Sequence, residues 1–155
     1  MRRLLGPTAT LLLVGPLVLL GGCGDEPTTE ESPAPSASAA AEPRLVRLLH
    51  GSGVGGRTDP VAVALPDEQA VQQWASGLDD GFATELAEAA RRARADLAPG
   101  RLLHGAVVHL GCEVPTGVTV TEEGDGLRVV ADGVPKPTSE CLVAVTTVAL
   151  VDAPA

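Results

Sequence analysis

The chain has almost no aromatic residues: Trp74 and Phe82 are its only tryptophan and phenylalanine, and it has no tyrosine. Platforms that stack nucleic-acid bases or sugars need several exposed rings, so this composition argues against such a site. Lysine is equally scarce, with Lys136 alone, and the formal net charge is −9 over 155 residues. Domains that bind phosphate backbones usually carry clustered Lys and Arg, so we do not expect nucleic acid as a partner.

Residues 1–22 have the order of features that defines a secretory signal peptide. Two arginines follow the initiator methionine, residues 11–20 form an apolar run, and two glycines precede Cys23. The alternative is a membrane-spanning helix that stays in the chain. Such a helix needs about 20 predominantly apolar residues, and this segment barely reaches that length and contains two prolines. We therefore expect residues 1–22 to be removed.

The segment Leu20-Gly21-Gly22-Cys23 resembles the lipobox of bacterial lipoproteins, which is an aliphatic residue, two small residues and a cysteine. The resemblance implies that Cys23 receives a thioether-linked diacylglycerol and becomes the new N-terminus after cleavage. It also implies a lipid-anchored location at the bacterial cell membrane, facing outside the cytoplasm. Each methylene of an acyl chain buried in the bilayer contributes about 0.8 kcal/mol to membrane binding, and two acyl chains suffice for stable anchoring where one does not.

Residues 23–43 follow the cleavage site and are predicted to form a disordered tether. They contain five acidic residues, four prolines and a Ser/Ala stretch, but no basic residue. Such a segment cannot bury enough apolar surface to fold. As a flexible coil it spans about 25 Å, which holds the domain away from the bilayer.

Residues 44–155 are expected to form one globular domain that begins with strands at 45–49 and 61–65. Asp67 is predicted to cap a helix whose apolar stripe is Val71, Trp74, Ala75 and Leu78. Asp79-Asp80-Gly81 breaks that helix and caps a second one, which we expect to end at Pro99-Gly100.

The rest of the domain is predicted to be β-structure. A strand at 102–110 is followed by a hairpin of 118–121 with 127–131, and the apolar run 141–151 is expected to be the longest, central strand. These elements predict an α+β class: a small two-layer domain with two consecutive helices packed on a largely antiparallel sheet. The globular part resembles no family that its motifs identify.

Cys112 and Cys141 are expected to form a disulfide, because an exported chain meets an oxidising environment. The alternatives are a metal-binding pair and a catalytic thiol. A zinc site needs two further ligands at short spacing, and the sequence has no C-x₂-C or H-x₃-H motif. A catalytic thiol would leave one cysteine unpaired outside the cell.

Two other groups of residues carry features of cofactor or metal sites. Residues 51–56 match G-x-G-x-x-G, but the following residues are β-like, whereas the dinucleotide fingerprint requires a helix. His104 and His109 differ by an odd number, so on a strand they point to opposite faces and cannot share a metal without a bulge between them. We therefore expect no cofactor and no metal. Arg91, Arg92 and Arg94 are interpreted as a solvated helix face rather than an anion site.

Three functional hypotheses remain from the sequence. The first is a membrane-anchored extracytoplasmic lipoprotein whose small domain is non-catalytic and binds or supports another envelope component. The alternative is an envelope hydrolase that uses His50, Ser52 and His104, although no spacing in the sequence pairs them as a triad. The third is a small-ligand carrier, which would need a cavity of several hundred cubic ångströms.

Overall fold

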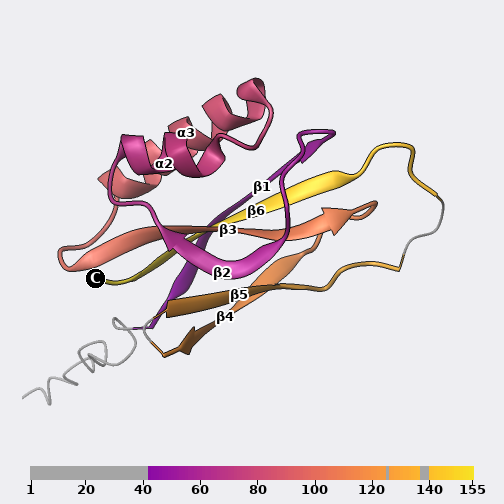
Figure 1. The fold of residues 1–155 in the computed structure, drawn as a ribbon. Helices are drawn as coiled ribbons and strands as arrows, with labels where there is room; N and C mark the ends of the chain where they lie inside the picture. Colours follow the sequence, from indigo (N-terminus) through magenta and orange to yellow (C-terminus); the bar gives the residue numbers. More distant parts are fainter. Residues whose placement is uncertain (1–41, 125, 137–139) are drawn as a thin grey trace, which may run out of the picture. The chain divides into compact units, whose positions relative to one another are not determined.

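A computed structural model of the chain describes residues 42–124, 126–136 and 140–155 (Figure 1). The predicted signal peptide, Cys23 and residues 24–41 lie outside the described residues. The described chain forms six strands and two helices. They are β1 (Arg44–Ser52), β2 (Asp59–Ala64), α2 (Glu68–Ala75), α3 (Asp80–Ala95), β3 (Arg101–Gly111), β4 (Gly117–Glu123), β5 (Gly126–Asp132) and β6 (Val145–Pro154).

The strands form one sheet in the order β1-β6-β3-β2-β5-β4. Every pair of neighbouring strands within it is antiparallel. The predicted hairpin is present as β4 and β5, which pair along their whole length. Strand β2 is joined weakly to both of its neighbours, because its register with β3 shifts between Asp59 and Val63 and only Val61 pairs with β5.

Both helices begin where the sequence places their caps. The Asp67 carboxylate accepts a hydrogen bond from the Ala70 N–H at 2.8 Å, and that of Asp79 accepts from Gly81 N–H and Phe82 N–H at 2.9 and 3.2 Å. Such bonds satisfy N–H groups that the first helical turn leaves without partners. Helix α3 ends earlier than expected, at Ala95 rather than at Pro99-Gly100, and Asp96 is its C-cap.

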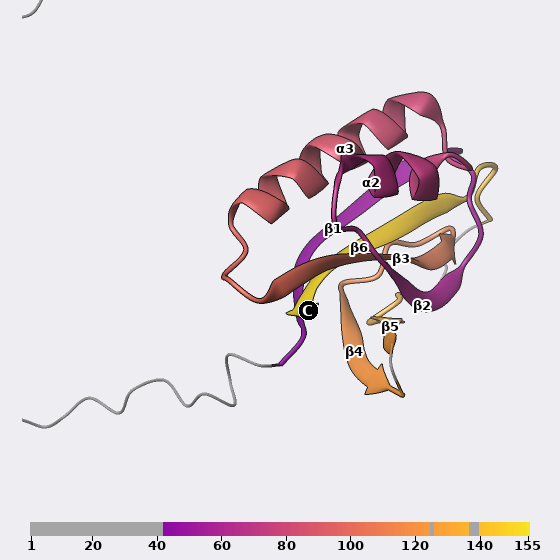
Figure 2. The same cartoon turned by 60° about the vertical axis from the view of Figure 1, so that its left-hand side comes forward.

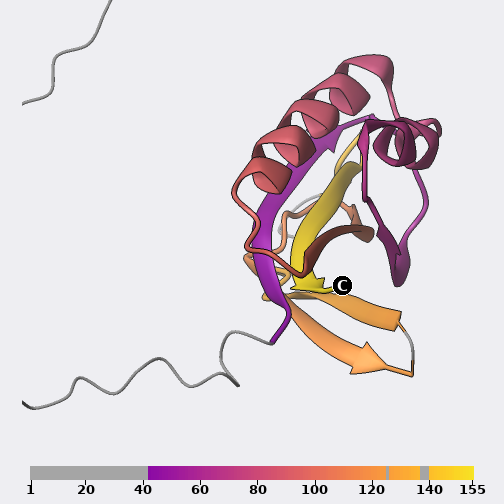
Figure 3. The same ribbon diagram turned by 90° about the vertical axis from the view of Figure 1, so that its left-hand side faces the viewer.

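The sheet is curled and buries apolar side chains on both of its faces. The helices cover one face of β1, β6 and β3 (Figure 2), and the β4–β5 hairpin folds beneath the other face (Figure 3). Phe82 and Leu86 of α3 pack against Leu49, Leu103 and Val148 in the first core. The second core contains Ala106, Val108, Leu127, Val129, Ala149, Val151 and Ala153. The mixed α+β class and its antiparallel sheet are thus confirmed, with strands dominating.

Strand β6 has the predicted central position, between β1 and β3, and residues 146–153 are all buried. Its predicted start at Cys141 was wrong, because the strand begins at Val145. Leu142 and Val143 are exposed, and Cys141 is bonded to Cys112 rather than paired in the sheet. Strand β3, with 11 residues, is also longer than the 10 residues of β6. An apolar run indicated the strand but not its boundary.

Candidate functional site

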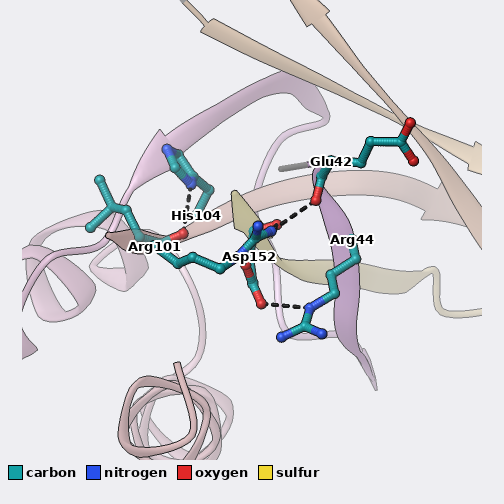
Figure 4. A network of polar contacts seen from close by, with 6 residues as sticks. Glu42, Arg44, Arg101, His104 and Asp152 are labelled. Atoms are coloured by element: carbon teal, nitrogen blue, oxygen red, sulfur yellow. Dashed lines mark hydrogen bonds and ion pairs between the residues drawn. The ribbon is translucent and has the colours of Figure 1, made fainter. Parts of the chain in front are cut away.

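Asp152 is fully buried near the end of β6, and two arginine side chains converge on its carboxylate (Figure 4). Arg44 of β1 donates from Nε to Oδ2 at 2.7 Å, and Arg101 of β3 donates from Nε to Oδ1. The Arg101 side chain is only 9% exposed, whereas that of Arg44 is 65% exposed. These three side chains, which we call the Asp152 cluster, connect β6 to the strands on both sides of it.

The Asp152 cluster also holds the segment that enters the domain. Arg101 donates from Nη2 to the carbonyl oxygens of Glu42 at 2.8 Å and Asp152 at 3.0 Å. Glu42 belongs to the end of the predicted tether, so the contact lies where the tether meets the sheet. This cluster was not predicted from the sequence. The signal that could have shown it is a carboxylate directly after the apolar run that ends at Val151.

His104 lines an open groove of about 440 Å³ on the sheet face away from the helices. Ala62, Glu122 and Leu127 line the same groove. Burial lowers the pKa of His104, while a hydrogen bond between its Nδ1 and the Leu102 carbonyl, at 3.2 Å, partly opposes that shift. The neutral imidazole therefore donates from Nδ1 and leaves Nε2 as an acceptor that can bind a polar ligand.

The three residues of the hydrolase hypothesis are not brought together. His50 lies opposite Thr147 of β6, and Ser52 lies opposite Val145. His104 lies opposite Val151. Val151 is four residues beyond Thr147, so His104 lies about 13 Å from His50 in the direction of the strands. The geometry therefore provides no contact between His104 and the other two side chains.

The prediction that His104 and His109 point to opposite faces was wrong. The register of β3 against β6 shifts between Val107 and His109, which is a β-bulge. His104 is opposite Val151, and His109 is opposite Thr147, so both histidines lie on the face away from the helices. An extra residue in one strand reverses the alternation that follows it. Because the bulge depends on pairing with β6, the β3 sequence alone did not show it.

This bulge aligns His50, Thr147 and His109 across β1, β6 and β3, in what we call the histidine row. Thr147 has no exposed surface. Its Oγ1 is the only buried side-chain polar atom without a hydrogen-bond partner in the described part of the chain. Leaving a buried hydroxyl unsatisfied costs about 1–3 kcal/mol. The neighbouring Thr146 differs, because its hydroxyl donates to the Gly55 carbonyl at 2.6 Å.

A second groove, of about 340 Å³, lies beside β2, and apolar side chains line it together with Arg57, Thr58 and Asp59 at one end of β2. Val61 and Val63 are 55% and 43% exposed. Trp74 of α2 forms part of the wall, and so does Leu78, which was predicted to lie on the same helix but follows its end at Ala75. Trp74 packs closely over Gly105, where a Cβ atom would lie 2.6 Å from the indole ring. The two solvent-exposed valines beside the single tryptophan form an apolar surface that a partner can cover.

The described structure also shows how other predicted residues are placed. Cys112 and Cys141 form a disulfide, with an S–S distance of 2.02 Å. The glycine-rich segment 51–56 is followed by β2 and not by a helix, as its sequence predicted. Arg91 is exposed and Arg92 pairs with Glu88 at 3.5 Å on the exposed surface of α3, as expected of a solvated helix face. Arg94 differs, because it is half-buried and donates to the Asp67 carbonyl at 3.3 Å.

Among the residues that the structure describes, no helix is both long enough and apolar enough to cross a membrane. The same residues contain no group of three or more His, Cys, Asp or Glu side chains arranged to hold a metal ion. Comparison of the chain with protein-family models, curated proteins and solved structures finds no match.

Proposed function

We propose that this chain is a lipid-anchored lipoprotein outside the cytoplasm, whose folded domain is a non-catalytic binding module for another envelope component. The observation that carries the binding role is the apolar groove beside Trp74, where Val61 and Val63 are open to solvent. In this proposal the helices and the sheet face beneath them act as a rigid two-layer support for the groove. The bound partner presents an apolar segment, because apolar side chains gain most by leaving water.

The Asp152 cluster supports the anchored arrangement. A domain that is held through an N-terminal tether carries any load first on the segment that enters its sheet. Arg101 binds the Glu42 carbonyl, and Arg44 binds Asp152, so the entry segment is fastened to β3 and β6 at that point. In this proposal the lipid anchor pulls on the N-terminal end of β1. The contacts of Arg44 and Arg101 then resist separation of β1 from β6 and β3.

Acylation is tested by incorporation of a labelled fatty acid in living cells. We expect label on the wild-type chain and none on Cys23→Ser. The matched control is the double variant Cys112→Ser/Cys141→Ser, which keeps Cys23 and is expected to retain label if it accumulates. Label that persists on Cys23→Ser ends the proposal of a lipid anchor.

The binding role is tested with a photo-crosslinking amino acid placed at Val61 in intact cells. The control places the same amino acid at Arg91, which is exposed on α3. We expect a discrete adduct at position 61 that is absent at position 91 and is lost when Val63→Asp is added. The same adducts at both positions, or none at Val61, contradict binding in this groove.

A further inference from the structure

We propose that the groove lined by Ala64, His104 and Glu122 binds an extended peptide, which adds as a strand along β2 and carries a basic side chain. This groove, of about 440 Å³, lies on the sheet face away from the helices. Ala64 lines it, whereas Val63 lines the apolar groove, so the two grooves lie on opposite faces of β2. This second site depends neither on the lipid anchor nor on binding in the apolar groove.

The groove lies where β2 and β5 separate. Val61 with Arg128 is the single pair that joins these two strands within the described chain. The next step of an antiparallel ladder would place Ala62 opposite Leu127. These two residues do not continue the ladder, and both line the groove instead. The sheet is therefore open between β2 and β5, and the hollow lies in that opening.

The backbone of Ala64 faces this opening. Leu65 donates its N–H to the carbonyl of Leu103, directly opposite on β3, at 2.7 Å. Hydrogen-bonded and non-hydrogen-bonded pairs alternate along an antiparallel ladder, so the adjacent pair, Ala64 with His104, is not hydrogen-bonded. The N–H and C=O of Ala64 therefore point away from β3, and no strand of the described chain is opposite them on that side. An extended peptide supplies the donor and acceptor that these two groups need.

Two prolines limit the length of the peptide that can pair. Pro60 and Pro66, which have no N–H group, stand on either side of residues 61–64. Four residues of a strand span about 13 Å. The side chains of Ala62 and Ala64 extend into the groove by a single methyl group each and leave space for the side chains of a ligand. A short extended segment therefore fits this edge better than a whole strand does.

The ionisable side chains of the groove favour a basic peptide. Among the described residues that line it, only Glu122 has a side chain that is charged at neutral pH, because burial lowers the pKa of His104. The Nδ1 of His104 is held by the Leu102 carbonyl at 3.2 Å (Figure 4), so Nε2 is a further acceptor. A Lys or Arg side chain donates hydrogen bonds to both acceptors. The chain's own residues 24–43 do not match, because they contain five acidic residues and no basic one.

Fluorescence anisotropy with the purified full chain in detergent tests this site. The probe is a labelled hexapeptide of alternating threonine and lysine. A second peptide has glutamate in place of lysine, and a third keeps lysine but has N-methyl groups on its backbone amides. We expect the first peptide to bind and the other two to bind about tenfold more weakly or not at all.

Three outcomes of this experiment would overturn the proposal. Equal binding of the first and third peptides would mean that charge alone attracts the probe. Failure of the first peptide to bind would mean that the edge of β2 does not accept a strand. Sedimentation of the chain as a dimer that the first peptide neither binds nor dissociates would assign the edge to a second copy.

Variants locate the bound peptide. Ala64→Leu places a larger side chain in the groove and should weaken binding of the lysine peptide about tenfold. Glu122→Gln should weaken it about two- to fivefold, as expected for an exposed ion pair. Glu85→Gln, on the exposed surface of α3, is the matched control and should bind as the wild type does. Equal losses in Glu122→Gln and Glu85→Gln would contradict binding in this groove.

A second measurement uses the wild-type chain and so does not depend on the folding of a variant. Nuclear magnetic resonance of the nitrogen-bound protons is recorded while the lysine peptide is added. We expect the backbone amide of Ala64 to shift while the indole N–H of Trp74 stays in place. A shift at Trp74 without one at Ala64 would place the peptide in the apolar groove and refute the assignment.

Discussion

Arg101 and Asp152 lie on neighbouring strands β3 and β6 and form an ion pair in which the carboxylate is fully buried. Their side chains come from positions 51 residues apart in the chain, and Arg44, 108 residues from Asp152, binds the other carboxylate oxygen. A buried carboxylate without a partner is strongly unfavourable. The pairing therefore fixes the relative positions of β1, β6 and β3 at the end where the chain enters the domain.

The two arginines should differ greatly in their effect on stability. Arg101→Ala leaves the buried carboxylate without its buried partner and should lower the free energy of unfolding by about 3–5 kcal/mol. Arg44→Ala removes a mostly exposed side chain and should cost about 1 kcal/mol or less. Urea denaturation at pH 7 measures both. Equal losses in the two variants would mean that burial of Arg101 does not determine the strength of the pair.

Features that depend on neighbouring residues in the chain were predictable from the sequence. Asp67 and Asp79 cap helices within three residues of themselves, and the apolar stripe of Val71 and Ala75 is buried as expected. The hairpin of β4 and β5 likewise follows from its short turn. In each case the physical cause lies within a few residues, so a single segment contains the information.

Features that depend on distant pairing were not predictable. The bulge after Val107 exists only in register with β6, and it alone brings His109 to the face of His50. Regular alternation along β3 would place His104 and His109 on opposite faces, which is why their common face was not predicted. The burial of Asp152 was not predicted either, because its partners Arg44 and Arg101 come from two other strands.

The disulfide should contribute substantially to stability. Cys112 and Cys141 are 29 residues apart, and closing a loop of that length stabilises the fold by about 3–4 kcal/mol on the chain-entropy model. The double variant Cys112→Ala/Cys141→Ala should lose that amount in urea denaturation. Dithiothreitol should destabilise the wild type similarly and leave the double variant unchanged. A reductant effect of equal size on both chains would contradict this origin.

Two adjacent threonines on β6 offer a matched comparison. Thr147→Val removes an unpartnered buried hydroxyl and keeps the side-chain shape, so it should raise the free energy of unfolding by about 1–2 kcal/mol. Thr146→Val breaks the hydrogen bond to the Gly55 carbonyl and should lower it by about 1 kcal/mol. Urea denaturation measures both changes. A destabilised Thr147→Val variant would show that its hydroxyl has a partner in solution.

The lowered pKa of His104 predicts a pH-dependent stability with a definite sign. Because burial favours the neutral ring, the folded chain takes up a proton at a lower pH than the unfolded chain, whose value is about 6.5. Above this pH both states are neutral at His104, and the residue contributes no pH dependence. As the pH falls through 6.5 toward the folded pKa, only the unfolded state is protonated, so the folded state loses stability.

His104→Asn should remove this loss of stability at low pH. The difference in unfolding free energy between wild type and variant, measured from pH 7.5 to 4.5, should shift in favour of the variant below pH 6.5. A difference that stays constant over this range, or that shifts toward the wild type, would mean that His104 is not held neutral by burial in the groove.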